Sequence, residues 1–294
     1  MQDLKGKVAF ITGGAGGIGL AMAKAFGREG MSVMLADVEP GTLKSAVEEL
    51  RAGQVRAEGV VADVTSRDSL RAAALETIAK FGKVHIVCNN AGVGAGGPVG
   101  TVPANDWRWV VDVNLHGVVH GMEIFAPLMI SHGEGGHFVN TASMAGMVSP
   151  PGMEPYCATK FAVVAMSEGW AMQFAEHNIG VSILCPGFVK TRIHESRRNR
   201  GAAYGPDDRP QIAADAAPSP VLSGIPVEPV AARVVEGIKD GDLYIFTHPE
   251  FKAAVAARFD TILAAFDKAA ASPALAALPA RTLAIPDVSG PVFT

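Results

Sequence analysis

Two residues in the middle of the chain could transfer a proton to or from a carbon-bound oxygen. Lys160 follows Tyr156 by four residues, which places both side chains on one face of an expected helix. A free tyrosine has a pKa of about 10 and is a poor base at neutral pH, but a nearby ammonium favours the phenolate. Ser143 lies 13 residues before Tyr156, where its hydroxyl could hydrogen-bond a substrate oxygen. The three residues predict general acid–base catalysis by the tyrosine.

A glycine-rich turn near the N-terminus could hold a pyrophosphate. Gly13, Gly17 and Gly19 follow an apolar run, and a helical pattern starts at Ile18. Glycine permits a tight turn and a close approach of backbone N–H groups, and a helix N-terminus favours an anion. Together with the proton-transfer residues, this turn predicts hydride transfer between a nicotinamide and an alcohol or carbonyl carbon.

An acidic residue ends the next expected strand. Asp37 comes 18 residues after Gly19. A carboxylate at this place accepts hydrogen bonds from the adenosine ribose and repels a 2′-phosphate. The sequence therefore favours NAD over NADP. The alternative is that Asp37 only caps the turn before Pro40.

The elements that must position these residues alternate along most of the chain. Strands are expected at 8–12, 32–37, 55–62, 84–89, 136–142, 181–185 and 243–247, and helices at 18–29, 41–52, 66–81, 105–131, 156–177, 228–240 and 249–270. Several strands are apolar on both faces, which is typical of buried parallel strands. We predict an α/β fold with a doubly wound, mainly parallel seven-stranded Rossmann sheet and helices on both faces, as one catalytic domain over 1–294.

Two regions depart from this alternation. Residues 190–229 are rich in proline, and a connection of this length after a strand suggests a substrate lid. The lid carries Arg197, Arg198 and Arg200. We expect these arginines to form a solvated face, with the alternative that one reaches the cofactor or a substrate carboxylate. A helix and an irregular tail are expected over 249–294.

The composition argues against several kinds of partner. The 294 residues are 49% apolar and 18% charged, with a net charge of −4. This allows a sizeable core but no basic surface for nucleic acid or an anionic membrane. The N-terminus lacks the apolar stretch of a signal peptide, and no uninterrupted apolar run approaches a membrane span. Three cysteines suggest free thiols in a reducing cytoplasm.

Two histidines have a spacing that can hold a metal. His116 and His120 are one turn apart on an expected helix. There is no glutamate at the position that an H-E-x-x-H motif requires, and His116 lies about 200° around the helix from Asn114. We expect no metal site.

Motifs in order along about 5–243 resemble those of the short-chain dehydrogenases/reductases, in their compact single-domain branch. They are Thr12-Gly13-x3-Gly17-Ile18-Gly19, Asp63-Val64, Asn89-Asn90-Ala91-Gly92, Asn114, Ser143, Tyr156-x3-Lys160 and Pro186-Gly187 with Thr191. The resemblance implies that Asp63 and Val64 contact the adenine and that Asn114 holds a water relay to Lys160.

The resemblance also implies complete sets of site residues. Thr191 would bind the nicotinamide carboxamide, and 90–92 would line the nucleotide cleft. The expected cofactor-binding set is Gly13, Gly17, Ile18, Gly19, Asp37, Asp63, Val64, Asn90, Ala91, Gly92, Tyr156, Lys160, Pro186, Gly187, Val189 and Thr191. The expected catalytic set is Asn114, Ser143, Tyr156 and Lys160.

A narrower resemblance bears on the substrate. Segments 136–143, 192–196 and 243–248 are similar to those of bacterial Cα-dehydrogenases, which oxidise benzylic alcohols in lignin-type aryl ethers with NAD. The expected substrate pocket is lined by Val93, Met144, Met153, Phe188 and Ile193. Apolar walls with adaptable methionines favour a bulky secondary alcohol, with an aryl carbinol as the best candidate, and its ketone.

Three alternatives remain open. The protein could be an NADPH-dependent carbonyl reductase, a catalytically silent dinucleotide-sensing protein, or a structural subunit whose tail is its main interface. The family resemblance also implies a homo-oligomer, a dimer or tetramer, paired through helices 105–131 and 156–177. Small residues on the second of these helices suit close packing: Ala158, Ala162, Ala165 and Gly169.

Overall fold

Seven short runs rich in apolar residues form the strands of the computed structural model, which describes residues 1–206 and 220–276. The strands are β1 (Val8–Thr12), β2 (Ser32–Asp37), β3 (Ala57–Val61), β4 (Ile86–Asn89), β5 (Gly136–Thr141), β6 (Ile179–Cys185) and β7 (Tyr244–Phe246). β1, β4 and β5 are buried along their whole length. Such burial requires cover on both faces.

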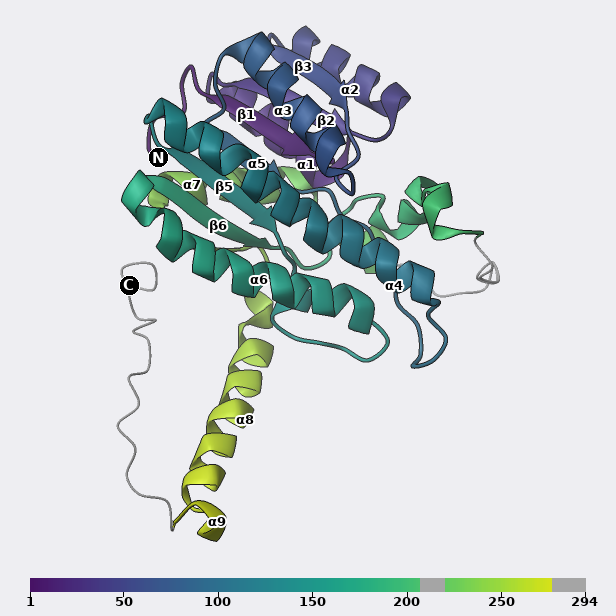
Figure 1. Ribbon diagram of the computed structural model, residues 1–294, viewed down its shortest axis with the longest axis vertical. Helices are drawn as coiled ribbons and strands as arrows, with labels where there is room; N and C mark the ends of the chain where they lie inside the picture. The colour runs from purple at the N-terminus through teal and green to yellow at the C-terminus, as the bar shows by residue number, and fades with distance from the viewer. Residues whose placement is uncertain (207–219, 277–294) are drawn as a thin grey trace. The chain divides into compact units, whose positions relative to one another are not determined.

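The strands form one sheet in the order β3-β2-β1-β4-β5-β6-β7, and every neighbouring pair is parallel (Figure 1). The predicted doubly wound, seven-stranded Rossmann sheet is confirmed. The strand order reverses direction between β1 and β4, and ligands of such sheets bind at the carboxyl ends of the strands at this point.

Helices connect the strands and cover both faces of the sheet (Figure 1). They are α1 (Gly17–Arg28), α2 (Pro40–Ala52), α3 (Arg67–Phe81), α4 (Ala104–Val111), α5 (Gly117–His132), α6 (Glu154–Phe174) and α7 (Val227–Asp240). One layer contains α1 packed against α7 and α2, and the other contains α3 packed against α5 and α4 against α6.

The helix predicted over 105–131 is interrupted. The turn Asp112–His116 between α4 and α5 is a π-helix. Such turns have the wider i→i+5 bonding pattern, which apolar periodicity does not predict, and they are frequent at functional sites. Ala104–His132 is long and apolar enough to cross a membrane by length and composition, but 56% of its most apolar window is buried inside the structure. This is the burial expected of a core helix.

The two ends of the predicted lid pair with each other through an isolated parallel bridge between Val189 and Ile225. The backbone N–H of Ile225 donates to the carbonyl of Phe188 at 2.9 Å, and that of Lys190 donates to the carbonyl of Ile225 at 2.9 Å. The lid therefore ends earlier than the predicted residue 229, because α7 begins at Val227. Between these ends lie short 3₁₀ turns, η4 (Ile193–Asn199), η5 (Ala202–Tyr204) and η6 (Pro220–Ser223), while 207–219 lie outside the described residues.

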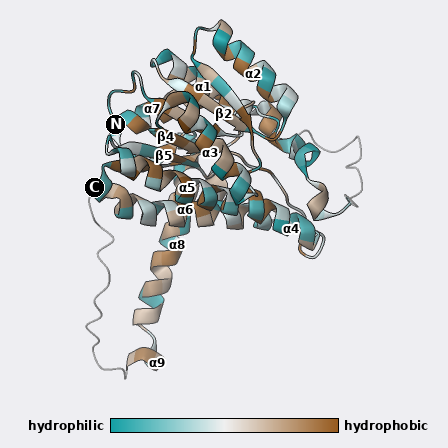
Figure 2. Cartoon of the chain, turned by 45° about the horizontal axis from the view of Figure 1, so that its top comes forward, coloured by the Kyte–Doolittle hydropathy of each residue, from teal (hydrophilic) through white to brown (hydrophobic). Residues whose placement is uncertain are grey.

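The chain divides into two compact units, Met1–Thr247 and His248–Thr294. The second unit contains α8 (Lys252–Ala270) and α9 (Pro273–Ala276), and the predicted tail beyond 276 lies outside the described residues. None of the side chains of α8 is buried, and several of them are large and apolar. The hydropathy of the residues along this helix is shown in Figure 2. A single domain over 1–294 stays a prediction.

Candidate active site

The glycine-rich turn lies between β1 and α1 and depends on its glycines. Gly13 has a φ of +61°, which L side chains rarely adopt. A Cβ at Gly19 would lie 2.2 Å from the carbonyl oxygen of Gly13, and one at Gly17 would lie 3.1 Å from the Cγ2 of Thr191. No side chain caps the N-terminus of α1. Its first N–H groups therefore have no side-chain acceptor, which leaves them available to an anion.

The ends of β1 and β4 are bound together beside this turn. The hydroxyl of Thr12 accepts hydrogen bonds from the backbone N–H groups of Asn90, at 2.9 Å, and Ala91, at 3.0 Å. The side-chain amide of Asn90 donates in return to the carbonyl of Thr12 at 3.0 Å. Asn90, Ala91 and Gly92 are thereby fixed along the edge of the sheet where the strand order reverses.

Asp37 has a structural role in addition to the predicted one. Its carboxylate accepts backbone N–H bonds from Ala15 at 3.0 Å and from Glu39 at 3.1 Å. It therefore fixes the glycine-rich turn against the turn that follows β2. A carboxylate offers about four lone-pair sites, so these two bonds leave capacity for ribose hydroxyls.

The expected adenine contacts sit in a locally determined turn. The carboxylate of Asp63 accepts hydrogen bonds from the backbone N–H and the hydroxyl of Thr65, at 2.9 and 2.8 Å. The side chain of Val64 is buried against Gly117. The adenine contact stays a prediction for both residues.

Ser143, Tyr156 and Lys160 converge at the carboxyl end of β5. The Lys160 Nζ donates to the carbonyl of Thr141 at 2.7 Å and lies 5.5 Å from the centre of the Tyr156 ring. Ser143 hydrogen-bonds the phenol of Tyr156. Its hydroxyl also lies 3.3 Å from the carbonyl of Pro186, which joins the loop after β6 to the same place.

Asn114 lies in the π-helical turn and connects this cluster to the loop after β4. Its Oδ1 accepts the N–H of Val93 at 2.8 Å, and its Nδ2 donates to the carbonyl of Val93 at 2.9 Å. A Cβ at Gly92 would lie 3.5 Å from the Asn114 Oδ1 and 3.7 Å from the Lys160 Nζ. The loop expected to line the nucleotide cleft and the residues expected to transfer a proton are therefore neighbours. The water relay through Asn114 stays a prediction.

Burial opposes the lowering of the Tyr156 pKa that is expected from Lys160. In the chain by itself, burial raises the pKa of Tyr156 to about 12, although the hydrogen bond with Ser143 lowers it. Burial also lowers the pKa of Lys160 to about 8. The expected depression of the tyrosine pKa is wrong for the chain alone, because the loss of hydration disfavours both charged forms. At neutral pH the phenol is protonated and can donate a proton.

Comparison with known proteins identifies the family of the chain. The profile of the short chain dehydrogenase family matches residues 7–201. The chain belongs to this family. It is therefore an oxidoreductase, and the resemblance seen in the sequence motifs is confirmed.

Similar proteins of this short-chain dehydrogenase family cover nearly the whole chain. A "C alpha-dehydrogenase" of Sphingobium sp. is 35% identical over 90% of this chain and 87% of its own length. A "CLA biosynthesis dehydrogenase/reductase" of Lactiplantibacillus plantarum is 33% identical over 90% of this chain and 95% of its own. A solved short-chain dehydrogenase/reductase of Burkholderia phymatum, in complex with NAD, has a TM-score of 0.85 and 39% identity, and covers 97% of this chain and 100% of that one.

The arginines of the predicted lid form ion pairs with carboxylates. Arg197 and Arg200 bind the two oxygens of Asp106 in α4, at 2.8 and 3.0 Å, and Arg198 binds Glu39. Asp106 is 1% exposed and Arg200 5%. The expectation of a solvated face is therefore wrong for Arg200, whereas Arg198 stays exposed. The sequence did not predict these ion pairs, because 91 residues separate Asp106 from Arg197.

Replacing Asp106 by asparagine is expected to lower the free energy of unfolding by about 3–5 kcal/mol, because it leaves buried guanidinium charge uncompensated. Urea denaturation checks this. The control is Glu49→Gln, which breaks an exposed pair with Lys24 and should change stability by at most about 1 kcal/mol. Equal effects of the two variants would contradict the assignment.

The predicted substrate wall is divided between core and surface. Val93 and Met144 are buried, at 6% and 4% exposed, whereas Met153 and Phe188 are 37% and 47% exposed. Ile193 is partly buried. Met153 and Phe188 therefore have surface to offer a ligand. Val189, which is in the expected cofactor-binding set, is buried in the main hydrophobic core.

The two histidines with metal-like spacing have separate partners. His116 Nδ1 lies 3.0 Å from an oxygen of Asp112, and His120 Nδ1 lies 2.9 Å from the carbonyl of Val64. Within residues 1–206 and 220–276, no group of three or more possible ligands is placed to hold a metal ion.

Three threonines of the site were missed as functional candidates. Thr12 fixes Asn90 and Ala91, Thr141 accepts from Lys160, and Thr159 accepts from the Asn114 amide at 3.3 Å. A signal for two of them exists in the sequence, because Thr12 and Thr141 are the last residues of strands whose carboxyl ends form the site.

Proposed function

We propose that this protein is an NAD-dependent dehydrogenase that interconverts a bulky, largely apolar secondary alcohol and its ketone, with Tyr156 as general acid and base. The observation that carries the proposal is the convergence of Tyr156, Lys160 and Ser143 beside Gly92. The NAD complex of the Burkholderia phymatum protein and the Sphingobium Cα-dehydrogenase support the cofactor and an aryl carbinol substrate.

Some residues of the chain would bind the cofactor, and others would hold the substrate and transfer its proton. The glycine-rich turn would hold the pyrophosphate, and Asp37 would hold the adenosine ribose. When bound, the nicotinamide ring supplies or accepts the hydride. Ser143 would hold the carbinol oxygen by a hydrogen bond, and Tyr156 would take or return its proton. In alcohol oxidation the phenolate of Tyr156 would accept this proton and become the phenol. Lys160, buried against Thr141, would stabilise the phenolate before the proton is accepted.

The surface near the site supports an apolar substrate. Met153 and Phe188 are exposed apolar side chains that flank the catalytic residues in sequence. The lid arginines are paired with Asp106 and Glu39, so they do not favour an acidic substrate. Methionine adapts to irregular shapes, which suits a bulky aryl group.

A comparison of substrates tests this proposal. We expect a higher kcat/KM with NAD for a 1-arylpropanol than for a sugar alcohol or a hydroxyacyl thioester. A clear preference for either of the latter would contradict the substrate class. Absence of NADH formation with any alcohol, together with tight dinucleotide binding, would instead favour a sensing protein.

The reverse reaction is a second candidate, carbonyl reduction with NADPH. The protonated phenol of Tyr156 favours it, because ketone reduction requires a proton donor. Measuring the aryl ketone with NADH and NADPH in parallel separates the two proposals. A kcat/KM at least as high with NADPH would favour the reductase.

Asp37→Ala is expected to weaken NAD binding about tenfold and to raise the affinity for NADP relative to NAD, because it removes charged acceptors from ribose and a repulsion from the 2′-phosphate. Fluorescence titration with both dinucleotides checks this. Asp37→Asn is the matched variant, since it removes the charge but keeps an acceptor for Ala15. A wild-type preference for NADP would contradict the role of Asp37.

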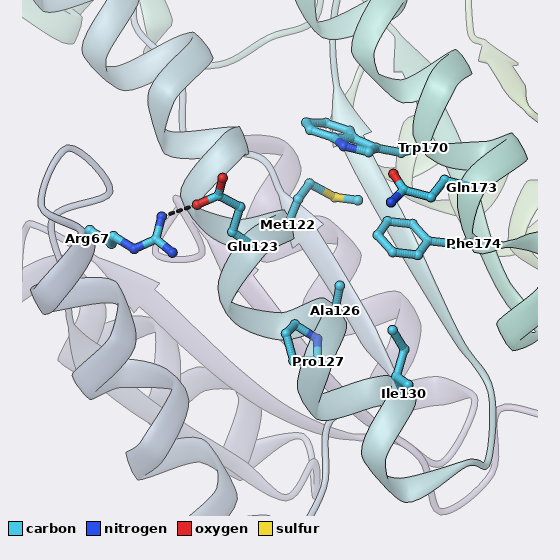
Figure 3. Close-up of a pocket in the computed structure, with 9 residues that line it drawn as sticks. All are labelled: Arg67, Met122, Glu123, Ala126, Pro127, Ile130, Trp170, Gln173 and Phe174. Carbon is cyan, nitrogen blue, oxygen red and sulfur yellow. Dashed lines mark hydrogen bonds and ion pairs between the residues drawn. The ribbon is translucent and has the colours of Figure 1, made fainter.

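We also propose a homo-oligomer, a dimer or a tetramer, that pairs through α5 and α6. A groove of about 450 Å³ lies between these helices (Figure 3). It is lined by Arg67, Met122, Glu123, Ala126, Pro127, Ile130, Trp170, Gln173 and Phe174. Ala158, Ala165 and Gly169 of α6 are exposed, which suits close helix packing.

Light scattering at micromolar concentration is expected to give a dimer or tetramer for the wild type and a smaller species for Trp170→Glu, because a charge in the groove would be buried on association. Leu75→Glu in α3, where the leucine is 62% exposed and outside the groove, is the control. A monomeric wild type would contradict this proposal.

A further inference from the structure

The segment 191–200 crosses the carboxyl edge of the sheet and is attached at several places. Thr191 begins it in contact with the position of Gly17 in the phosphate turn. In its middle, the hydroxyl of Ser196 accepts the backbone N–H of Gly94 at 3.0 Å. The segment therefore touches both the loop after β1 and the loop after β4, which flank the expected nucleotide cleft.

The far end of this segment is bound to the turn after β2. Arg198 binds the Glu39 Oε1 through Nε at 3.0 Å and through Nη2 at 2.9 Å, and the Asn199 amide donates to the same oxygen at 2.9 Å. The backbone of Glu39 in turn donates to Asp37 at 3.1 Å. Contacts thus run from the residue proposed to hold the ribose to a segment 159 residues away in the chain.

The two ionic attachments of the segment differ in exposure. The pair on Asp106 is buried, with Asp106 1% and Arg200 5% exposed. The pair on Glu39 is open to solvent, with Arg198 32% and Glu39 25% exposed. Exposed ion pairs separate at little cost, whereas a buried pair is costly to break. The segment would therefore open first at Glu39 and stay attached at Asp106.

We propose that Glu39, Arg198 and Asn199 form a clasp that closes the segment 191–200 over the dinucleotide and slows its release. The proposal rests on the proposed function, since it assumes that a dinucleotide lies along the phosphate turn between Asp37 and Thr191. These three are positioning residues. They lie outside the family motifs in the sequence, and they act by holding the cover of the cleft in place.

Release of NADH tests the clasp. In stopped-flow displacement, Glu39→Gln and Arg198→Met are each expected to release NADH roughly fivefold faster than the wild type. This change in rate corresponds to the free energy that an exposed ion pair contributes. The double variant should release it no faster than the faster single variant, because both changes break one contact. Glu236→Gln is the matched control, since it removes an equal charge from an exposed pair with Arg233 in α7, outside the segment, and it should leave the rate unchanged.

Hydrogen exchange of the free protein gives a second readout that needs no cofactor. Amides of 193–199 should exchange faster in Glu39→Gln than in the wild type and in Glu236→Gln. Unchanged release in both single variants, additive effects in the double variant, or unchanged exchange would each overturn the clasp while leaving NAD binding intact. A wild type that binds no NADH would overturn the proposed function and the clasp together.

Discussion

Replacement of Tyr156 by phenylalanine is expected to lower kcat for alcohol oxidation by at least about 100-fold, the typical contribution of a general acid or base. Phenylalanine removes the transferable proton and little volume. The ring can still pack beside Lys160, so NADH should bind as it does to the wild type. Steady-state turnover and NADH fluorescence titration measure the two effects separately.

A second tyrosine provides the control for this change. Tyr244 in β7 hydrogen-bonds Glu168 through its hydroxyl, so Tyr244→Phe removes an equivalent group outside the cluster. We expect its turnover to stay near that of the wild type. Near-normal turnover of Tyr156→Phe would remove Tyr156 from the mechanism.

Gly19→Ala is expected to weaken NADH binding by about tenfold to 100-fold. The new methyl group would lie 2.2 Å from the Gly13 carbonyl oxygen, closer than real contacts allow, so the phosphate turn must shift. Overpacking of this kind typically costs about 1–3 kcal/mol. Because the shift moves the N–H groups proposed to bind the phosphates, the cost should be seen in Kd from fluorescence titration.

Gly16 lies in the same turn and gives the matched control. A Cβ at Gly16 meets nothing within 4 Å, and its φ of −165° is open to any residue. Gly16→Ala should therefore bind NADH like the wild type. Equal losses of affinity in the two variants would show that the Gly13–Gly19 contact does not explain the requirement for glycine.

Local features of the site were predictable because they depend on near neighbours in sequence. The four-residue spacing of Tyr156 and Lys160 fixes their common face once a helix forms, and α6 spans both residues. The phosphate turn follows from the glycines between an apolar strand and an amphipathic helix. The positions of the strand ends then bring Asn90 and Ser143 to one edge, because all strands are parallel.

The sequence by itself determined the family, the parallel sheet and the two sets of residues that meet at its carboxyl edge. Only the tertiary structure decided the partners of Arg198 and Asp106, which lie 159 and 91 residues from the groups they bind. It also decided the direction in which the pKa of Tyr156 shifts, since burial of the phenol raises this pKa although the spacing to Lys160 favours the phenolate. Pairing over such separations and loss of hydration both arise from packing of the whole chain, and neither leaves a periodic pattern in the sequence.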